Sequence, residues 1–93
     1  MIASYRNKET EKMAMGERVK KFQAIERIAR RTLLGLRAAS RLEDLAAHPG
    51  NRLEALKGHR KGQYSLPVND QYRICFAWKD GSAYEVEIVD YHS

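Results

Sequence analysis

The fold of this chain is decided by residues 72–89, which read YRICFAWKDGSAYEVEIV. Large apolar side chains stand at every second position before and after the pair Asp80-Gly81. A period of two is typical of strands with one buried face, so this stretch predicts strands over 72–79 and 83–89. Asp-Gly between two such runs is a strong signal for a tight hairpin turn. The apolar positions are Tyr72, Ile74, Phe76 and Trp78 before the turn, and Tyr84, Val86 and Ile88 after it.

A further strand is predicted immediately upstream, because the same alternation begins at residue 63. Tyr64, Leu66 and Val68 alternate there with smaller or more polar residues. Pro67 cannot donate a ladder hydrogen bond, which favours an edge strand or a bulge at this point. Asn69-Asp70 is a turn signal between this strand and the next. The three segments together predict an antiparallel meander.

Upstream of residue 50 the apolar spacing changes to that of helices. Apolar residues between 22 and 36 fall on one face of a helical period, which predicts a helix over about residues 20–37. A second helix is predicted to begin near Ser40, since Ser40 and Glu43 have the capping-box spacing, and to end at Pro49-Gly50. Residues 6–18 predict a polar connector with at most one turn of helix, and residues 1–5 have the length of a short strand. The apolar helical positions are Phe22, Ile25, Ile28, Ala29, Leu33 and Leu36 in the first helix, and Leu42, Leu45 and Ala46 in the second.

This order of elements predicts an α+β fold. Two N-terminal helices would pack on an antiparallel sheet made of the short N-terminal strand and the three-stranded meander. At 93 residues the chain is expected to form a single domain over 1–93. Cys75 is its one cysteine, so no disulfide forms within it, and its histidines match no metal-site spacing. It has neither a membrane-spanning stretch nor a signal peptide, so we expect a cytoplasmic protein without a cofactor.

The charge balance indicates a polyanionic partner. Lys and Arg number 17 against 12 Asp and Glu, which gives a formal net charge of +5. A basic surface attracts nucleic acid first, although many basic domains bind none. Two basic groups are candidates for RNA contacts, and each could equally be a solvated surface. They are Lys20, Lys21, Arg27 and Arg31 on the first predicted helix, and Arg52, Lys57, Arg60 and Lys61 in the loop before the meander.

Candidate catalytic groups follow the last predicted strand. Asp90 and His92 are two residues apart, so on a strand they project from the same face. A carboxylate beside an imidazole orients it for acid–base chemistry. Tyr91 faces the other way if the strand stays regular. The alternative for all three residues is a frayed, solvated terminus.

Arg73 is a candidate cation for the same site. It lies in the middle of the predicted sheet, where its planar guanidinium could clamp a phosphate or could form an interstrand pair with Glu85 or Glu87. An acid, a base and nearby cations suffice to cut RNA without a metal, because the RNA 2′-hydroxyl is an internal nucleophile. The signatures of other enzyme classes, such as a phosphate-binding Gly-rich loop or His-Glu-x-x-His, are missing.

Four runs of the sequence carry a family resemblance. They are GNRLEALKG at 50–58, GQYS at 62–65, VNDQYRICFAW at 68–78 and VEIVDYH at 86–92. Taken in order, they resemble the HigB toxins of the RelE superfamily, which belong to bacterial type II toxin–antitoxin systems. The resemblance implies an endoribonuclease that cleaves mRNA in the ribosomal A site. It also implies a HigA-like helix-turn-helix antitoxin as partner, through which the complex would bind operator DNA.

The resemblance also implies roles for particular residues. His92 would be the main proton-transfer group, Asp90 would orient it or act beside it, and Tyr91 would position or stack a base. Arg73 and Lys57 match basic positions of the family and would stabilise phosphate charge.

Two positions depart from the family pattern. Glu54 stands where some members have a histidine, and a carboxylate could still move protons but offers no positive charge. Pro67 stands where an arginine or a similar residue is common. Two alternatives on the same fold stay open: a non-catalytic RNA- or DNA-binding module, and a decayed toxin that only binds its antitoxin.

Overall fold

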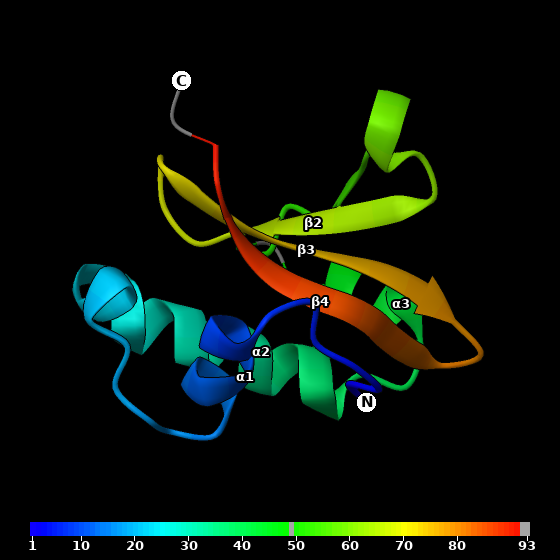
Figure 1. Cartoon of the computed structure of the whole chain (residues 1–93). Coiled ribbons are helices and arrows are strands. Elements are labelled where there is room, and N and C mark those ends of the chain that lie inside the picture. Colours follow the sequence, from blue (N-terminus) through cyan, green and yellow to red (C-terminus); the bar gives the residue numbers. More distant parts are fainter. Residues whose placement is uncertain (49, 92–93) are drawn as a thin grey trace.

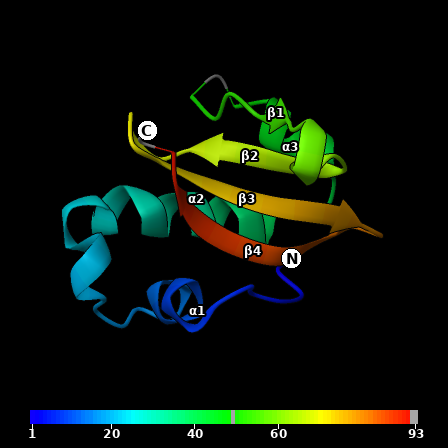
Figure 2. The same ribbon diagram turned by 45° about the horizontal axis from the view of Figure 1, so that its top comes forward.

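The computed structural model describes residues 1–48 and 50–91 of the chain. Helices α1 and α2 lie together on one side of a four-stranded sheet, as Figures 1 and 2 show from two directions. The predicted α+β class is confirmed. In chain order the elements are α1 (Lys8–Ala14), the 3₁₀ segment η1 (Lys20–Ile25), α2 (Glu26–Ala38), α3 (Leu42–Ala46), β1 (Glu54–Ala55), the 3₁₀ turn η2 (Gly58–Arg60), β2 (Gln63–Pro67), β3 (Tyr72–Lys79) and β4 (Ser82–Asp90).

The sheet has the strand order β1-β2-β3-β4, and all neighbouring strands are antiparallel. The predicted meander is therefore confirmed. The β3–β4 hairpin turns at Asp80 and Gly81, whose φ values of 51° and 79° are both positive, as a type I′ turn requires. The turn before β3 is closed by Asn69, whose side chain accepts hydrogen bonds from the backbone N–H groups of Gln71 (2.8 Å) and Tyr72 (2.7 Å).

The prediction that the strand with Pro67 is an edge strand or carries a bulge is wrong, because β2 lies between β1 and β3 and its register with β3 is regular. β1 pairs only with Tyr64 and Ser65 of β2, so Pro67 lies past the end of β1. On its other side Pro67 is the register partner of Arg73 in β3. β1 falls within the segment that was expected to be a loop, because a strand of two residues is too short to carry a periodic signal.

The core lies between the sheet and helices α1 and α2. Its sheet side consists of alternating apolar residues of the meander, of which Ile74 and Phe76 are fully buried. Tyr84 is an exception: the irregular pairing near Glu85, whose φ is 53°, leaves Tyr84 exposed and buries Ala83 in its place. Its helix side is the predicted apolar face of η1 and α2 without Ile28, which is exposed, together with Met13 of α1. The ring of Phe22 meets Tyr72 edge-on with centroids 5.7 Å apart, which ties η1 to β3. Large apolar side chains thus determine which face of the sheet the helices cover.

The segment before η1 corrects the sequence prediction. Residues 6–18 contain α1, whose N-cap Asn7 accepts a hydrogen bond from the N–H of Thr10 (2.9 Å). Because α1 is mostly charged and buries only Thr10 and Met13, it has no apolar stripe for sequence analysis to detect. The Thr10 hydroxyl in turn accepts a hydrogen bond from the backbone N–H of Ile88 (3.0 Å), which docks α1 on β4.

Residues 1–5 do not form a regular strand but pair with β4 through two isolated parallel bridges, Ile2 with Ala83 and Tyr5 with Val86. Backbone hydrogen bonds reinforce this pairing, including one from the N–H of Val86 to the Ser4 carbonyl (3.1 Å). The segment therefore covers the outer edge of β4 and satisfies N–H groups that an open edge would leave unpaired.

The two predicted helices form, but their starts differ from the prediction. The first is interrupted at Phe22, where the backbone is not helical, so the 3₁₀ segment η1 precedes α2. The second, α3, has Arg41 as its N-cap, and Asp44 rather than Glu43 satisfies the free N–H groups. The Asp44 carboxylate accepts hydrogen bonds from the N–H groups of Arg41 (3.0 Å) and Ser40 (3.1 Å), which lower the pKa of Asp44.

Candidate active site on the open face of the sheet

The face of the sheet that turns away from α1 and α2 carries most of the candidate site. Side chains alternate along a strand, so the burial of Ile74 and Phe76 in the core places their neighbours on the opposite face. We call this opposite surface the open face. Register partners on it form a row across all four strands: Glu54 in β1, Ser65 in β2, Cys75 in β3 and Glu87 in β4, with Arg73 next to Cys75 along β3.

Arg73 is held on the open face by two contacts. Its Nε donates a hydrogen bond to Ser65 Oγ (2.8 Å), and its Nη2 lies 3.7 Å from Glu54 Oε1. The pairing with Glu54 takes the place of the considered pairing with Glu85 or Glu87. The structure thus brings together two predicted site residues, Arg73 and Glu54, of which Glu54 is the more exposed.

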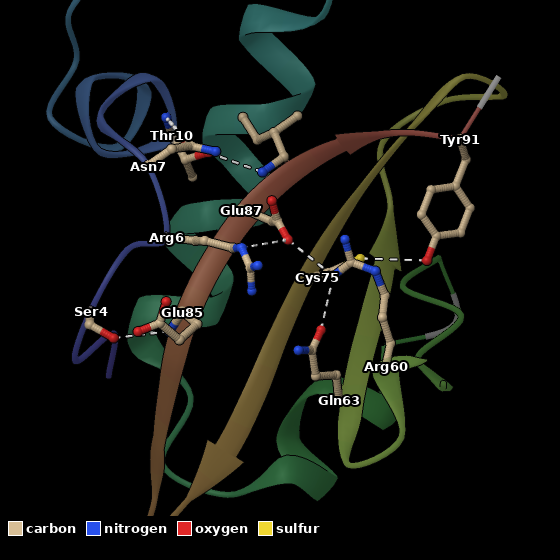
Figure 3. A network of polar contacts seen from close by, with 11 residues as sticks. Ser4, Arg6, Asn7, Thr10, Arg60, Gln63, Cys75, Glu85, Glu87 and Tyr91 are labelled. Carbon is tan, nitrogen blue, oxygen red and sulfur yellow. Dashed lines mark hydrogen bonds and ion pairs between the residues drawn. The ribbon is translucent and has the colours of Figure 1, made fainter. Parts of the chain in front are cut away.

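A second guanidinium, that of Arg60, reaches the open face from η2 (Figure 3). Its Nη1 donates hydrogen bonds to Glu87 Oε1 and to Gln63 Oε1, both at 3.0 Å. The same Glu87 oxygen lies 3.6 Å from Nε of Arg6. Burial works against the charge of Arg60, but the hydrogen bond to Glu87 and the nearby acidic groups together outweigh it and raise the pKa of Arg60. Arg60 is therefore a fixed positive charge on this face.

Tyr91 follows β4 and returns to the open face. Its backbone N–H donates to the Gln71 carbonyl (2.7 Å), and its hydroxyl oxygen lies 3.6 Å from Cys75 Sγ. Burial raises the pKa of Cys75, although the hydrogen bond with Tyr91 opposes this shift. Burial and the contact with Cys75 also raise the pKa of Tyr91. Both groups are thus protonated at neutral pH, and the phenol stays a neutral hydroxyl.

Asp90 lies on the other side of the strand from Tyr91. Its register partner is Tyr72, whose ring packs on the helix side of the sheet, so Asp90 and Tyr91 point in opposite directions as predicted. Asp90 is exposed, and its Oδ2 accepts a hydrogen bond from Gln71 Nε2 (3.1 Å). His92, the predicted proton-transfer group, lies outside the described residues.

The predicted basic loop flanks β2. Lys57 precedes η2 as its N-cap residue and is exposed, as are Lys61 and Arg52. Arg52 has a φ of 44°, a left-handed conformation that is uncommon for a residue with a side chain. Arg60 is the member of the loop that is joined to the open face by contacts.

The basic residues of the predicted first helix do not belong to this face. They lie on η1 and α2, which pack on the other side of the sheet (Figure 2), and their side chains point to solvent there. Lys21 is paired with Glu9 at 3.6 Å. The structure thus separates the open face from a second basic surface formed by Lys20, Lys21, Arg27 and Arg31.

The contacts that hold the site together were not predictable from the sequence. Glu87 was considered only as a partner of Arg73, whereas it binds Arg60 and Arg6. Its position between the buried residues Val86 and Ile88 does predict that it faces away from the core. Nothing in the sequence signals which cation meets it, because Arg60 comes from a separate element 27 positions away.

The open face carries the guanidinium groups of Arg60 and Arg73, the phenol of Tyr91 and the carboxylates of Glu54 and Glu87, with Arg6 beside Glu87. This set is suited to binding a phosphodiester and to proton transfer near it. Over residues 1–48 and 50–91, no group of three or more His, Cys, Asp or Glu side chains could hold a metal ion. Nor does any helix in those ranges have the length and apolar character needed to cross a bilayer.

Comparison with solved structures identifies the class of fold. A chain in the YoeB–YefM complex from Staphylococcus aureus matches with a TM-score of 0.62 at 17% identity, covering 100% of this chain and 99% of that one. At family level, the model described as the RelE-like toxin of type II toxin–antitoxin system HigB matches residues 4–92. The chain therefore belongs to the HigB-like toxin family, and the resemblance seen in the sequence is confirmed.

Two relatives with assigned names are similar to parts of the chain. Toxin HigB-1 of Vibrio cholerae serotype O1 is 48% identical over 60 residues, which are 64% of this chain and 63% of that protein. Endoribonuclease HigB of Proteus vulgaris is 42% identical over 41 residues, which are 44% of this chain and 45% of that protein. The chain thus aligns with less than two thirds of the length of either relative.

Proposed function

We propose that this chain is a cytoplasmic, ribosome-dependent mRNA endonuclease that inhibits translation as the toxin of a type II toxin–antitoxin system, with residues 1–93 as one toxin domain. The observation that carries the proposal is the match of residues 4–92 to the HigB-like toxin family. One relative bears the name endoribonuclease, which supports the activity. The open face supports it further, because it combines a phenol with two guanidinium groups.

In the proposed reaction the 2′-hydroxyl of the RNA attacks the adjacent phosphate, and the 5′-oxygen leaves. A base takes the proton of the 2′-hydroxyl and an acid gives one to the 5′-oxygen as its bond to phosphorus breaks, which leaves a 2′,3′-cyclic phosphate. His92 is the main proton-transfer group in this scheme and Asp90 assists it, while Tyr91 positions a base at the scissile step. Arg73 and Lys57 stabilise the charge that develops on the phosphorane. No metal or cofactor takes part in this scheme.

Glu54 has a double role in the proposal. As a carboxylate it can accept a proton at the position where some relatives have a histidine. Its oxygen also lies 3.7 Å from Nη2 of Arg73, so a phosphate that binds Arg73 competes with Glu54 for the same donor. The ribosome contributes by holding the mRNA in place, which lowers the entropic part of the cleavage barrier. This matters here because the domain itself supplies few catalytic groups.

The proposed partners follow from the family. A type II system supplies an antitoxin, for which we propose a HigA-like helix-turn-helix protein, and the toxin would meet operator DNA only through that complex. The mRNA in the ribosomal A site is the proposed substrate. The exposed basic residues Arg52 and Lys61 are proposed to contact RNA phosphates.

The experiment that tests this function maps cleavage of one reporter mRNA in a cell-free translation reaction, with and without ribosomes. Wild type is compared with His92→Ala and with His48→Ala, a matched loss of an exposed histidine next to α3. We expect cuts that need ribosomes, are lost with His92→Ala and persist with His48→Ala.

The other outcomes separate the alternatives. Equal cutting by His92→Ala would remove His92 from the chemistry and direct attention to Glu54 and Lys57. Absence of cutting by wild type, with RNA binding intact, would favour the non-catalytic binding module. Absence of both, with tight antitoxin binding, would favour the decayed toxin.

A further inference from the structure

The Arg60 side chain is anchored at one end of its guanidinium. Both of its contacts, to Glu87 Oε1 and Gln63 Oε1, are made by Nη1. Across residues 1–48 and 50–91, Nε and Nη2 of Arg60 meet no acceptor. These two atoms form the edge of a guanidinium that binds two oxygens of a phosphate at once. Arg60 is thus anchored through Nη1, and its Nε–Nη2 edge is left without a protein partner among the described residues.

Arg73 presents the opposite arrangement. Its Nε is bonded to Ser65 and its Nη2 faces Glu54, so its phosphate-binding edge is occupied by protein groups. A phosphate that approaches Arg73 must displace the Glu54 carboxylate or use the remaining nitrogen. On the open face, Arg60 is therefore the arginine whose geometry is better prepared for a phosphodiester.

The place of Arg60 relative to Tyr91 supports the same role. Figure 3 shows the guanidinium between Glu87 and the hydroxyl of Tyr91, beside Cys75. The hydroxyl of Tyr91 lies 3.6 Å from Cys75 Sγ, and the Arg60 charge lowers the pKa of both groups against the larger effect of burial. A phosphate bound at the open edge of Arg60 would consequently lie next to the phenol that is proposed to position a base.

Glu87 contacts the Arg60 guanidinium and is argued to orient it, without touching a ligand itself. Its side chain is only 13% exposed, and its carboxylate lies between two cations, Nη1 of Arg60 and Nε of Arg6. A buried carboxylate would repel RNA if it faced the ligand directly. Paired with Arg60, it instead holds the guanidinium in a single orientation and reduces the side-chain entropy that binding would cost.

We propose that Arg60 is a phosphate-binding residue of the cleavage site, and that Glu87, acting through Nη1, is the positioning residue that aims its Nε–Nη2 edge at the RNA backbone beside Tyr91. The inference rests on the proposed function, because it assigns residues to that same site. It extends the earlier expectation for Arg60, which was general attraction of RNA to a basic loop.

The test is a double-mutant cycle in the ribosome-supplemented cleavage reaction, with kcat and KM measured separately. We expect Arg60→Ala to lower kcat/KM by about 100-fold and Glu87→Gln by about tenfold. Because Glu87 acts through Arg60, the double variant should be no worse than Arg60→Ala alone. Arg60→Lys, which keeps the charge without the fork, should recover only part of the loss.

The matched control is Arg6→Ala, which removes the other cation on Glu87 and leaves the Arg60 contact in place. It should retain cleavage within a factor of about two. Multiplicative losses in the double variant would overturn the positioning role of Glu87, and cleavage by Arg60→Ala close to wild type would overturn the role of Arg60. Thermal unfolding of each variant establishes that the measured losses occur in folded protein.

If wild-type protein fails to cut mRNA, the proposed endonuclease function is refuted, but phosphate binding by Arg60 can still be tested. Binding of an RNA oligonucleotide with 2′-deoxy substitutions, which cannot be cleaved by its own hydroxyl, would then be measured at low salt. A larger loss of affinity for Arg60→Ala than for Lys79→Ala, reproduced in part by Glu87→Gln, supports the inference. Equal losses from Arg60→Ala and Lys79→Ala would reduce Arg60 to one charge among many and overturn it.

Discussion

At the scale of single residues, the open face shows that two arginines on one surface need not be equivalent. Nε and Nη2 of Arg73 contact Ser65 and Glu54, whereas Arg60 contacts Glu87 and Gln63 through Nη1 alone. Both charges are permanent, so the difference between them lies in orientation. Orientation is therefore the property that substitutions on this face should probe.

Replacing Arg73 with alanine should reduce cleavage without unfolding the protein. We expect kcat/KM to fall by roughly 100-fold if Arg73 meets the phosphorane charge. The loss of its hydrogen bond to the buried Ser65 hydroxyl should cost about 1–3 kcal/mol of unfolding free energy, less than a domain of this kind holds in reserve. Ser65→Ala is the matched control, since it removes the partner and keeps the cation. A collapse of the melting temperature in Arg73→Ala would show a structural residue instead.

The contact between Cys75 and Tyr91 predicts a weaker fold in alkaline solution. Both pKa values are raised in the folded protein, first by burial, so the folded state keeps protons that the unfolded chain releases. Their contribution to stability is complete below the unfolded pKa values and is lost as the pH rises through the folded ones. Urea unfolding should thus show stability falling above about pH 8.5, the ordinary value for cysteine. Cys75→Ala should flatten this decline, and an unchanged slope would contradict the prediction.

At the scale of elements, the three strands of the meander were predictable, whereas α1 and β1 were not. The meander is predictable because apolar and polar residues alternate along each strand, and because Asp80-Gly81 can adopt two successive positive φ values. α1 has no apolar stripe that would predict a helix, because Thr10 and Met13 are its only buried residues and the rest of its surface is mostly charged. β1 is paired over two residues, a length that only the neighbouring β2 can define. Local pattern therefore predicts the elements that bury a whole face and misses those that depend on tertiary contact.

The same reasoning applies to the site. Asp90, Tyr91 and Arg73 could be proposed because they stand in or next to strands whose faces can be counted. The Arg60–Glu87 contact could not be predicted, because it joins the 3₁₀ turn η2 to β4, two elements that are far apart in the sequence. A strand pattern indicates that Glu87 points outward, but the path of the loop decides which cation it meets.

Substituting Thr10 with valine should loosen the contact between α1 and β4. The change keeps the buried volume and leaves the Ile88 N–H without its acceptor at the sheet edge. An unsatisfied buried donor costs about 1–3 kcal/mol, which denaturant unfolding can measure. Thr10→Ser keeps the hydroxyl and serves as the control for the lost methyl group. Similar losses in both variants would mean that packing, and not the hydrogen bond, holds α1 in place.

At the scale of the whole molecule, positive charge is divided between two sides. The open face carries Arg60 and Arg73, and the helix side carries the exposed residues of η1 and α2. Helices α1 and α2 cover the side of the sheet opposite to the open face, so the charges on η1 and α2 lie apart from the contacts of Arg60 and Arg73 (Figure 2). We therefore assign the helix side to a different polyanion, for which ribosomal RNA is the natural candidate in the proposed function.

The double variant Arg27→Gln/Arg31→Gln tests this division of charge. If the helix side holds the ribosome, KM for ribosome-bound mRNA should rise by about tenfold while kcat stays the same, and added salt should narrow the difference. The control is Lys8→Gln/Lys79→Gln, which removes two exposed charges at other places. Equal effects of the two pairs would indicate net charge alone, and a fall in kcat would place the helix residues in the chemistry.

The pairing of residues 1–5 with β4 has a consequence for the time at which the protein can act. The Ser4 side chain bonds the backbone of Glu85, a separation of 81 positions, so the segment that leaves a ribosome early must wait for a strand that is made much later. Contacts at such a distance along the chain form slowly. A nascent chain therefore has no completed open face until β4 has been made. Under the proposed function, a chain that still lacks β4 also lacks Glu87 and Tyr91, so it has no means of attacking a ribosome at that stage.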